Sequence, residues 1–425
     1  MVVQINKTTG LKTMLIPQKQ QIPEISEKVP FLTLQGISLP HIPHKLDKTG
    51  SNAKQKYNAK FPGVNFDYYT SITKTILTLC YPKSCPKCST TLSVEIPSRE
   101  TSVRCPKCHY MGSRTSLTPL DNFRLPLWTF GYILCEAVTM FPQPLSSSMI
   151  RRKLLCPKNT ATLLKRRLQL FLSEFIDPIK DIMNDELSKN DKLPVDLTNV
   201  FNTHKVASLD TVALFSAGTR SNGYRARYKH NGQTSSIYLT DSVALEKGKY
   251  QIGTLVHTVA FKKGPVIFDS VPDQRQKTLH PLLSFIPDNA PIFSDEGYPW
   301  LKHYNDNHRA INHSKRAKDK KRNVYSRERW CSNGVHNQVA EGNQRLLKYT
   351  FTASYSYIKP EYSQLYLNEF SALKAITLYG IDYLNSKRKK PSQEGRGSER
   401  AVCLIGREFQ HEARMPPKGA SPRLF

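Results

Sequence analysis

The segment KVASLDTVALF, residues 205–215, is the stretch from which the fold of this chain is most readily predicted. It is apolar and rich in residues that favour extended backbone, so it is typical of a buried β-strand. Asp210 stands in its middle, where a carboxylate is unfavourable unless it is paired or binds a cation. The segment therefore predicts a core strand that carries a candidate functional residue.

The chain downstream of this strand has the pattern of an α/β domain. Further strands are predicted at 223–230, 234–240, 250–261, 291–295 and 308–314, and helices at 271–286, 297–304, 335–351 and 358–376. Strands followed by a helix, and then strands alternating with helices, are typical of an α/β sheet that begins with a meander. The segment 315–329 has eight basic and two acidic residues, so we expect a solvated loop or one that faces DNA.

Upstream of the sheet, residues 125–141 form a near-continuous apolar run, LPLWTFGYILCEAVTMF. A membrane-spanning helix needs about 20 apolar residues, and Glu136 interrupts this run. We therefore expect a buried helix here and not a membrane span.

Residues 145–175 contain two helical patterns separated by the residues at 156–158. Asn159 is the expected N-cap of the second helix. Two short helices joined by a tight turn, the second of them basic, resemble a helix-turn-helix. We expect its leucines between 163 and 170 to pack inward, although a basic face that is merely solvated is the alternative to DNA contact. The residues predicted to contact DNA are Lys165, Arg166 and Arg167.

Four of the nine cysteines form two identical CPKC motifs, at 85–88 and 105–108. Two thiolates separated by two residues can reach one ion from a single turn, and two such turns make a tetrahedral site that suits zinc. The residues between the motifs alternate in polarity as the strands of a short hairpin do. Four unrelated surface cysteines would require the same motif to occur twice by chance. We therefore predict a zinc ribbon with one structural Zn²⁺, held by Cys85, Cys88, Cys105 and Cys108.

Composition points to a reducing compartment and a polyanionic partner. Lys and Arg number 62 and Asp and Glu number 34, which gives a net charge of +28. The cysteine count is odd and the N-terminus does not have the pattern of a secretory signal, so a disulfide framework is not expected. An excess of positive charge this large favours nucleic acid as the partner. A ribosome-associated protein, or a surface that is merely basic and soluble, is the alternative.

Three acidic residues are candidates for a catalytic metal site. Asp210 lies within a strand, Asp295 at the C-terminal end of one, where α/β sheets often place ligands, and Glu341 on a helix. Converging carboxylates would form an oxygen-rich site for two Mg²⁺ or Mn²⁺ ions and support in-line phosphoryl transfer. Lys348, seven positions after Glu341 on the same helical face, could bind a neighbouring phosphate. The alternatives are a salt-bridged core acid at Asp210, a helix N-cap at Asp295 and a solvated residue at Glu341.

The order of these features resembles the zinc-ribbon branch of the DDE transposases of bacterial insertion sequences, over about residues 80–375. Asp210 matches the first acid of that family, and Asp295, with Glu296 as the alternative, matches the second. Thr211 stands where the family usually has another acid, and Gln338 stands near the place of a family asparagine. The remaining matches are Gly297, Tyr298 and Leu301 after the second acid, and His336, Glu341, Leu346, Leu347 and Lys348 around the third.

The resemblance implies a ribonuclease H-like mixed sheet flanked by helices, preceded by a zinc ribbon and a helix-turn-helix-like domain. It also implies a transposase that binds terminal inverted repeats, cleaves DNA and joins it to target DNA, working as a homo-oligomer on DNA in the bacterial cytoplasm with the nucleoid. No membrane association is expected. The predicted organisation is a basic, partly disordered Pro-rich arm at 1–75, the ribbon at 76–115, the helical DNA-binding region at 116–200, the catalytic domain at 201–385 and a basic disordered tail at 386–425.

Two other functions fit part of this pattern. A non-catalytic zinc-ribbon DNA-binding protein, or an inactivated transposase, would share the charge and the ribbon without needing the three acids. A nuclease of the same fold would cleave DNA without joining it. Metal-dependent nicking separates the first alternative from a transposase, and strand transfer separates the second.

Overall fold

The computed structural model describes residues 52–189, 193–214, 254–271, 273–315, 326–355 and 360–388, together with 4–5, 12–13, 229–230, 233–234 and 358. The chain divides into two compact units, Met1–Pro43 and His44–Phe425. In the first unit, β1 (Gln4–Ile5) pairs antiparallel with β2 (Lys12–Thr13). Most of the predicted arm, most of the predicted strands at 223–240, the middle of the basic segment 315–329 and the tail beyond 388 lie outside the described residues.

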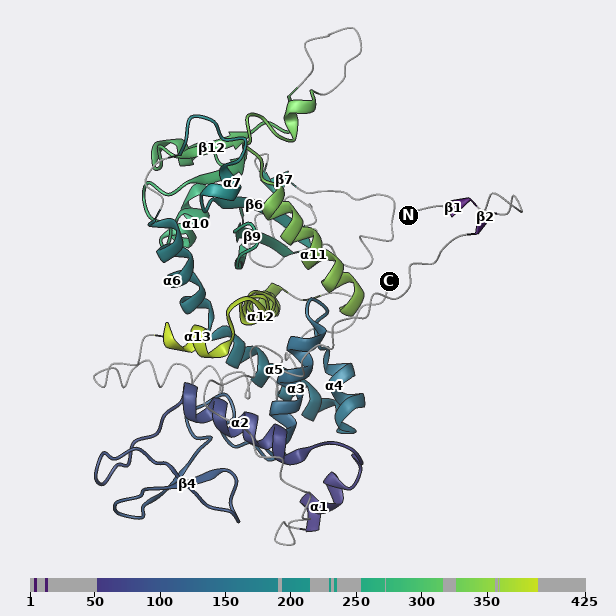
Figure 1. Ribbon diagram of the computed structural model, residues 1–425, viewed down its shortest axis with the longest axis vertical. Coiled ribbons are helices and arrows are strands. Elements are labelled where there is room, and N and C mark those ends of the chain that lie inside the picture. The colour runs from purple at the N-terminus through teal and green to yellow at the C-terminus, as the bar shows by residue number, and fades with distance from the viewer. Residues whose placement is uncertain are drawn as a thin grey trace. The chain divides into compact units, whose positions relative to one another are not determined.

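The centre of the second unit is a five-stranded mixed sheet with the order β10–β9–β6–β11–β12 (Figure 1). The middle strand, β6 (Ala207–Leu214), pairs antiparallel with β9 (Thr254–Ala260), which pairs antiparallel with β10 (Val266–Val271). On its other side β6 runs parallel to β11 (Ile292–Asp295), and β11 runs parallel to β12 (His308–Ile311). The prediction of an α/β fold is confirmed.

β10 is absent from the strands that the sequence predicts. It follows β9 after the tight turn at 261–265, in which Lys263 has a φ of 52°. The helix predicted at 271–286 is instead the end of β10 followed by α10 (Gln276–Leu279) and the 3-10 turn η1 (His280–Leu283). The segment at 297–304 also forms a 3-10 helix, η2 (Pro299–His303). A second short two-stranded sheet pairs β7 (Lys229–His230) with β8 (Gln233–Thr234).

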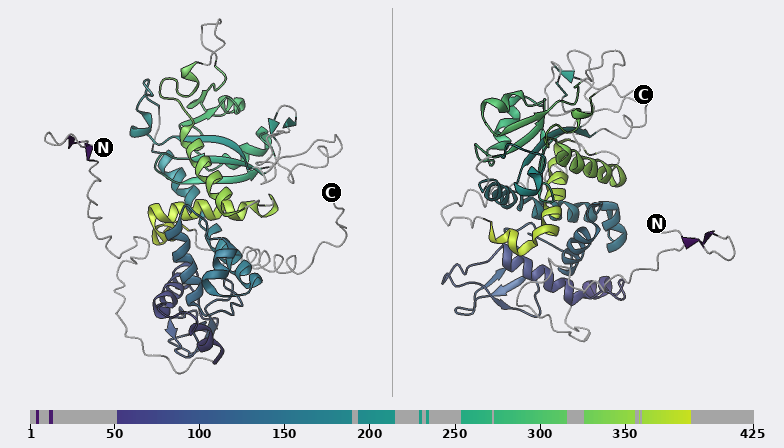
Figure 2. Two further views of the ribbon diagram at one scale, coloured as in Figure 1. Left: turned by 90° about the vertical axis from the view of Figure 1, so that its right-hand side faces the viewer. Right: turned by 45° about the horizontal axis from the view of Figure 1, so that its top comes forward.

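Two long helices, α11 (Gln338–Ser354) and α12 (Pro360–Tyr379), cover one face of the sheet (Figure 2). Burial of each large apolar side chain in this layer contributes roughly 1.5–3 kcal/mol. α6 (Ile176–Leu187) contacts β10, and α7 (Val200–Thr203) packs its Val200 against Val206 and against Phe293 of β11. The buried residues of the first layer are Val212, Val256, Ala260, Val266 and Phe268 from the strands and Leu347, Phe351, Leu367 and Phe370 from the helices.

Helices flank the ribbon on both sides in the chain. α1 (Asn52–Asn58) and α2 (Phe66–Cys80) precede it, and α3 (Trp128–Met140), α4 (Ser147–Leu154) and α5 (Lys158–Ser173) follow it. α12 packs against α5, and the final helix, α13 (Ile381–Ser386), contacts α2 and α6. These contacts join the helical region to the sheet within one compact unit.

The apolar run at 125–141 forms the buried helix α3, as predicted. It lies so close to α2 that a Cβ on Gly131 would be 2.3 Å from the carbonyl oxygen of Tyr69. The hydroxyl of Thr73 on α2 donates to the carbonyl of Leu127, 2.8 Å away, which ties the two helices together. Within the described part of the chain, none of the helices has the length and apolar character that a membrane crossing needs.

Candidate functional site

The four cysteines of the CPKC motifs form one compact cluster. Their sulfur atoms all lie within 4.8 Å of one another, and the closest pairs are Cys85 with Cys108 at 3.3 Å and Cys88 with Cys105 at 3.4 Å. Four thiolates arranged tetrahedrally at about 2.3 Å from a zinc ion have sulfur–sulfur distances of about 3.8 Å. The cluster is therefore a possible metal site whose spacing suits zinc.

The two motifs adopt the same backbone turn. In the first, Ser89 N–H donates to the carbonyl of Cys85 at 2.9 Å, and in the second, His109 N–H donates to that of Cys105 at 3.2 Å. Ser89 and His109 have φ values of 58° and 57°, in the left-handed region that is uncommon for residues other than glycine. His109 thus has a turn-forming role in the second motif that matches that of Ser89 in the first.

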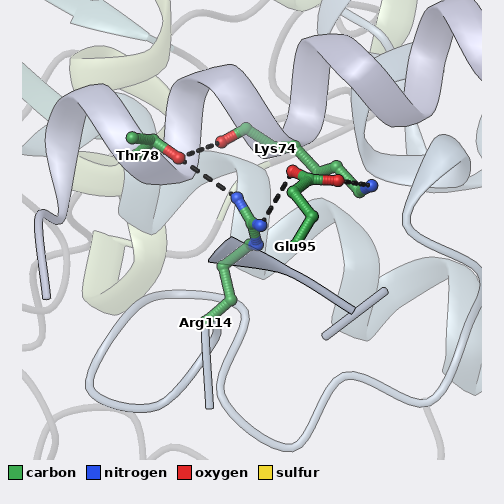
Figure 3. A network of polar contacts seen from close by, with 4 residues as sticks. All are labelled: Lys74, Thr78, Glu95 and Arg114. Atoms are coloured by element: carbon green, nitrogen blue, oxygen red, sulfur yellow. Dashed lines mark hydrogen bonds and ion pairs between the residues drawn. The ribbon is translucent and has the colours of Figure 1, made fainter. Parts of the chain in front are cut away.

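The strands that carry these turns are β3 (Val94–Glu95), β4 (Ser102–Arg104) and β5 (Met111–Ser113), paired antiparallel in that order. A polar network holds this small sheet against α2 (Figure 3). Arg114, just after β5, donates to Glu95 at 2.9 Å and to the hydroxyl of Thr78 at 3.1 Å. Lys74 on α2 donates to the second oxygen of Glu95 at 2.5 Å. The Arg114 side chain is only 6% exposed, so this ion pair is protected from water on the arginine side.

Asp210 and Asp295 lie on neighbouring parallel strands. The pairing of β6 with β11 matches Ala207 with Ile292 and Ser208 with Phe293. Carried two residues further along both strands, the same register sets Asp295 opposite Asp210. Side chains at matched positions of adjacent strands leave the same face of the sheet, so the two carboxylates share the face that α11 covers.

The electrostatics of Asp210 show that the third acid is near. Burial first, and then the charges of Asp295 and Glu341, raise the pKa of the Asp210 carboxyl to about 7, against hydrogen bonds from Thr211 N–H and the Gln344 side chain. Burial likewise raises the pKa of Asp295, whose carboxylate accepts a 2.9 Å hydrogen bond from Gly297 N–H. The ionisation of Asp210 is thus opposed by burial and by two neighbouring acids, and a nearby positive charge would relieve this opposition.

Gly297 is required by this arrangement. A Cβ at this position would lie 2.9 Å from Oδ1 of Asp295, the atom that accepts its N–H. The glycine of the segment after Asp295 therefore lets the backbone approach the carboxylate closely.

Glu341 lies in the first turn of α11, and its side chain is 37% exposed. Lys348 lies two turns further along the same helix and is exposed. Among the residues that the structure describes, only the four cysteines form a group of metal-ligand atoms within 4.8 Å of one another. The three carboxylates are thus near enough to influence one another, but they are spaced more widely than the cysteine cluster.

A buried polar network behind Asp210 is not predicted from the sequence. The phenol oxygen of Tyr298 lies 2.7 Å from the Thr211 hydroxyl and 3.0 Å from Nδ1 of His257. Burial lowers the pKa of His257 to about 4, so its imidazole is neutral. The network links β6, β9 and the segment after β11, which helps to fix the strands that carry Asp210 and Asp295. The Gly-Tyr pair at 297–298 was the available signal, because it marks Tyr298 as part of the motif.

The structure does not support DNA contact by Lys165 and Arg167. Lys165 is 1% exposed and its ammonium pairs with the equally buried carboxylate of Glu369 on α12. Arg167 is 7% exposed and donates to the carbonyls of Pro119 and Asp121, both at 2.7 Å. Arg166 is half-buried and lies over the ring of Tyr366. These side chains hold α5 in place. The prediction that Leu163 packs inward is wrong, because its side chain is 44% exposed.

The boundaries of the two helices also differ in detail from the prediction. α5 begins at Lys158 with Pro157 at the N-cap position and no side-chain cap, so Asn159 is not its N-cap. α4 ends at Leu154, and its C-cap residue Leu155 has the left-handed conformation that closes the turn. The exposed basic residues of the pair are Arg151 and Arg152 at the end of α4 and Lys158 at the start of α5.

Residues 218–371 match the family model of the ISXO2-like transposase domain. This match supports a DDE transposase of an insertion sequence, the family that the sequence resembles, over the part of the chain that it covers. The cysteine cluster is consistent with the zinc-ribbon branch of these proteins. Asp295, Glu341 and Lys348 lie inside the matched residues, and Asp210 lies shortly before them. No curated protein and no solved structure matches the chain.

Proposed function

We propose that this protein is an active DDE transposase, which binds the ends of its element and catalyses metal-dependent DNA cleavage and strand transfer. The observation that carries the proposal is the placement of Asp210 and Asp295 in register on adjacent strands, with Glu341 near enough to raise the pKa of Asp210. The charges of Asp295 and Glu341 oppose the ionisation of Asp210, and a bound cation would remove this opposition.

The sheet is best interpreted as a ribonuclease H-like fold. Its first three strands in the chain, β6, β9 and β10, form an antiparallel meander, and β11 and β12 add in parallel on the other side of β6. The first acid then lies on the first strand, as the resemblance implies, and the second lies at the end of β11, before Gly297 and Tyr298. The residues that match the transposase domain, 218–371, include four of these five strands, which are β9, β10, β11 and β12.

The residues proposed to hold two Mg²⁺ or Mn²⁺ ions are Asp210, Asp295 and Glu341. Carboxylate oxygens are the ligands that these cations prefer. When bound, the ions would supply activation of the attacking oxygen and stabilisation of the leaving one. The chain itself holds the carboxylates in place through Thr211, Gly297 and the first turn of α11. Lys348 is proposed to bind a phosphate of the DNA, because it is exposed on the helix that carries Glu341.

The cysteine cluster is proposed to hold one structural Zn²⁺. The three short strands around it bury few apolar side chains, chiefly Leu92 and Val103. A core this small supplies little stability, so the metal would contribute much of the folding free energy of the ribbon.

The DNA-binding surface is proposed to be a helix-turn-helix-like pair formed by α4 and α5. Because Lys165 and Arg167 are buried, the residues now proposed to contact DNA are Arg151, Arg152 and Lys158. These three residues flank the turn and are exposed. Lysine and arginine at such a surface bind phosphates and release counterions, which makes the affinity depend on salt. We also propose that the protein binds paired element ends as a homo-oligomer, as the resemblance implies.

A cleavage assay on the DNA that flanks this gene tests the proposal. The wild-type chain is expected to nick a labelled duplex of that DNA in Mg²⁺ or Mn²⁺, and to join the released 3′-hydroxyl to a supercoiled plasmid. Asp295→Ala and Glu341→Ala should abolish nicking while DNA affinity stays nearly unchanged. Glu296→Ala is the matched control, because Glu296 is the exposed neighbour of Asp295.

Each failure has a distinct meaning. Binding without nicking by the wild-type chain would favour the non-catalytic alternative. Nicking without joining would favour a nuclease. If Asp295→Ala nicks as well as the wild type and Glu296→Ala does not nick, the metal ligand would be Glu296 and not Asp295.

A further inference from the structure

His313 lies just beyond the C-terminal end of β12, next to the strand that ends at Asp295. β11 and β12 pair so that Asp295 is opposite Ile311, two residues before His313. The charge of His313 acts on Asp295 and opposes the rise of its pKa. The imidazole of His313 is therefore close to Asp295, but the proposed metal site does not assign it a role.

One nitrogen of this imidazole faces two residues of α11 at once. Nε2 of His313 lies 3.2 Å from Oδ1 of Asn337 and 3.6 Å from Oε1 of Glu341. The first distance is that of a hydrogen bond, and the second is a close contact beyond the usual range. The carboxylate therefore stays available for a cation while its position is bounded by the ring.

The side chain of Asn337 does not make the hydrogen bond that is usual for a residue at its position. It is the N-cap residue of α11 and is 1% exposed, but its side chain makes no capping hydrogen bond to the helix. Asparagine at an N-cap ordinarily accepts from an N–H of the first turn. Here its Oδ1 accepts from His313 instead, while its backbone carbonyl accepts Glu341 N–H at 3.1 Å. Asn337 thus connects the imidazole to the backbone of Glu341.

The imidazole is also packed from its other side. The ring of Trp330 lies 5.4 Å from that of His313, with the guanidinium of Arg329 over Trp330 at 4.6 Å. Nδ1 of His313 is buried and has no hydrogen-bond partner within the described residues. The ring is therefore held by packing on one side and by the contact with α11 through Nε2 on the other.

We propose that His313 is a positioning residue for Glu341, which fixes the first turn of α11 through Asn337 so that the third carboxylate meets Asp210 and Asp295. The inference rests on the proposed function of the three acids. Loss of the imidazole would free Asn337 to cap its own helix and would let the Glu341 side chain turn toward solvent. Removal of a group that orients a metal ligand typically reduces metal affinity or activity by about 10- to 100-fold.

Three substitutions at this position separate positioning from general stability. Glutamine can place an N–H near the position of Nε2, asparagine places it near Nδ1, and alanine removes it. We expect His313→Ala and His313→Asn to lower kcat for nicking of the flanking duplex, and to raise the Mg²⁺ concentration for half-maximal rate, by about 10-fold or more. His313→Gln should recover most of both, and the KM for DNA should change little in all three.

A readout without DNA is the rise in thermal midpoint when Mg²⁺ is added to the full chain. That rise should be smaller in His313→Ala than in the wild type and restored in His313→Gln. Equal Mg²⁺ responses and rates in the wild type and His313→Ala would overturn the inference, as would a loss of rate in His313→Ala that His313→Gln does not recover. Asp295→Ala is run in parallel: if it nicks normally the proposed function fails, whereas if it is inactive and His313→Ala is normal, only the role of His313 fails.

Discussion

Replacement of Asp210 by asparagine should make the protein more stable while abolishing its proposed catalysis. The pKa of Asp210 is raised from 3.8 to about 7, first by burial and then by the charge of Asp295. Each pKa unit corresponds to about 1.4 kcal/mol, so keeping this group ionised in the folded protein costs about 4 kcal/mol. Asparagine keeps an acceptor for Thr211 N–H but loses charge-assisted bonding, which costs about 1 kcal/mol. The net gain should be about 3 kcal/mol at pH 8.

The sign of the pH dependence follows from the direction of the shift. The folded state binds the Asp210 proton more tightly than the unfolded state, so its stabilising effect is complete below the unfolded pKa and is lost as pH rises through about 7. The advantage of Asp210→Asn should therefore shrink to about 1 kcal/mol at pH 5. Urea unfolding at the two pH values, with zinc but without Mg²⁺, measures both differences.

A matched control distinguishes a buried charge from a metal ligand. Asp269 on β10 is half-buried, with its Oδ2 fully buried, and burial raises its pKa. Asp269→Asn should likewise gain stability, but it should keep the rise in stability on addition of Mg²⁺, which Asp210→Asn should lose. A variant Asp210→Asn that is no more stable than the wild type at pH 8, or that still gains stability from Mg²⁺, would refute the reasoning.

Three other predictions concern the ribbon, the buried ion pair and the DNA surface. The purified chain should contain one zinc by metal analysis and lose it in Cys88→Ser but not in Cys135→Ser, a cysteine outside the cluster; zinc retained in Cys88→Ser would contradict the site. Lys165→Met should lower the free energy of unfolding by about 3–5 kcal/mol because it leaves the Glu369 carboxylate buried without its partner; the further change Glu369→Gln should recover most of this loss, and an unchanged urea midpoint in Lys165→Met would oppose it. Arg152→Ala should reduce the salt dependence of DNA affinity by about one counterion. The control is Lys189→Ala, at an exposed lysine just after α6, which should have no effect. If Arg152→Ala has the same salt slope as the wild type, Arg152 does not contact DNA.

Local pattern was sufficient where a residue's role depends on its near neighbours in the chain. The two CPKC motifs predict their cluster because a turn of four residues brings both thiols to one point. The apolar run at 125–141 predicts α3 because its length and continuity leave only a buried helix. Asp210 and Asp295 are conspicuous because a charge within or at the end of an apolar strand needs a compensating partner.

Only the tertiary structure decided which distant residues meet. Lys165 has the sequence context of an exposed basic helix, but its partner Glu369 lies 204 positions away, and hydropathy cannot distinguish a lysine that has a buried counterion from one in water. The pairing of β6 with β11 set Asp295 beside Asp210, since the order of strands in a sheet depends on long-range pairing and not on local period. The contact of His313 with Glu341 also depends on long-range packing, because that packing brings the residue just after β12 next to the first turn of α11. The sequence by itself indicated the α/β pattern and the kinds of group that its elements carry, although it missed β10, whereas long-range packing decided which groups face one another.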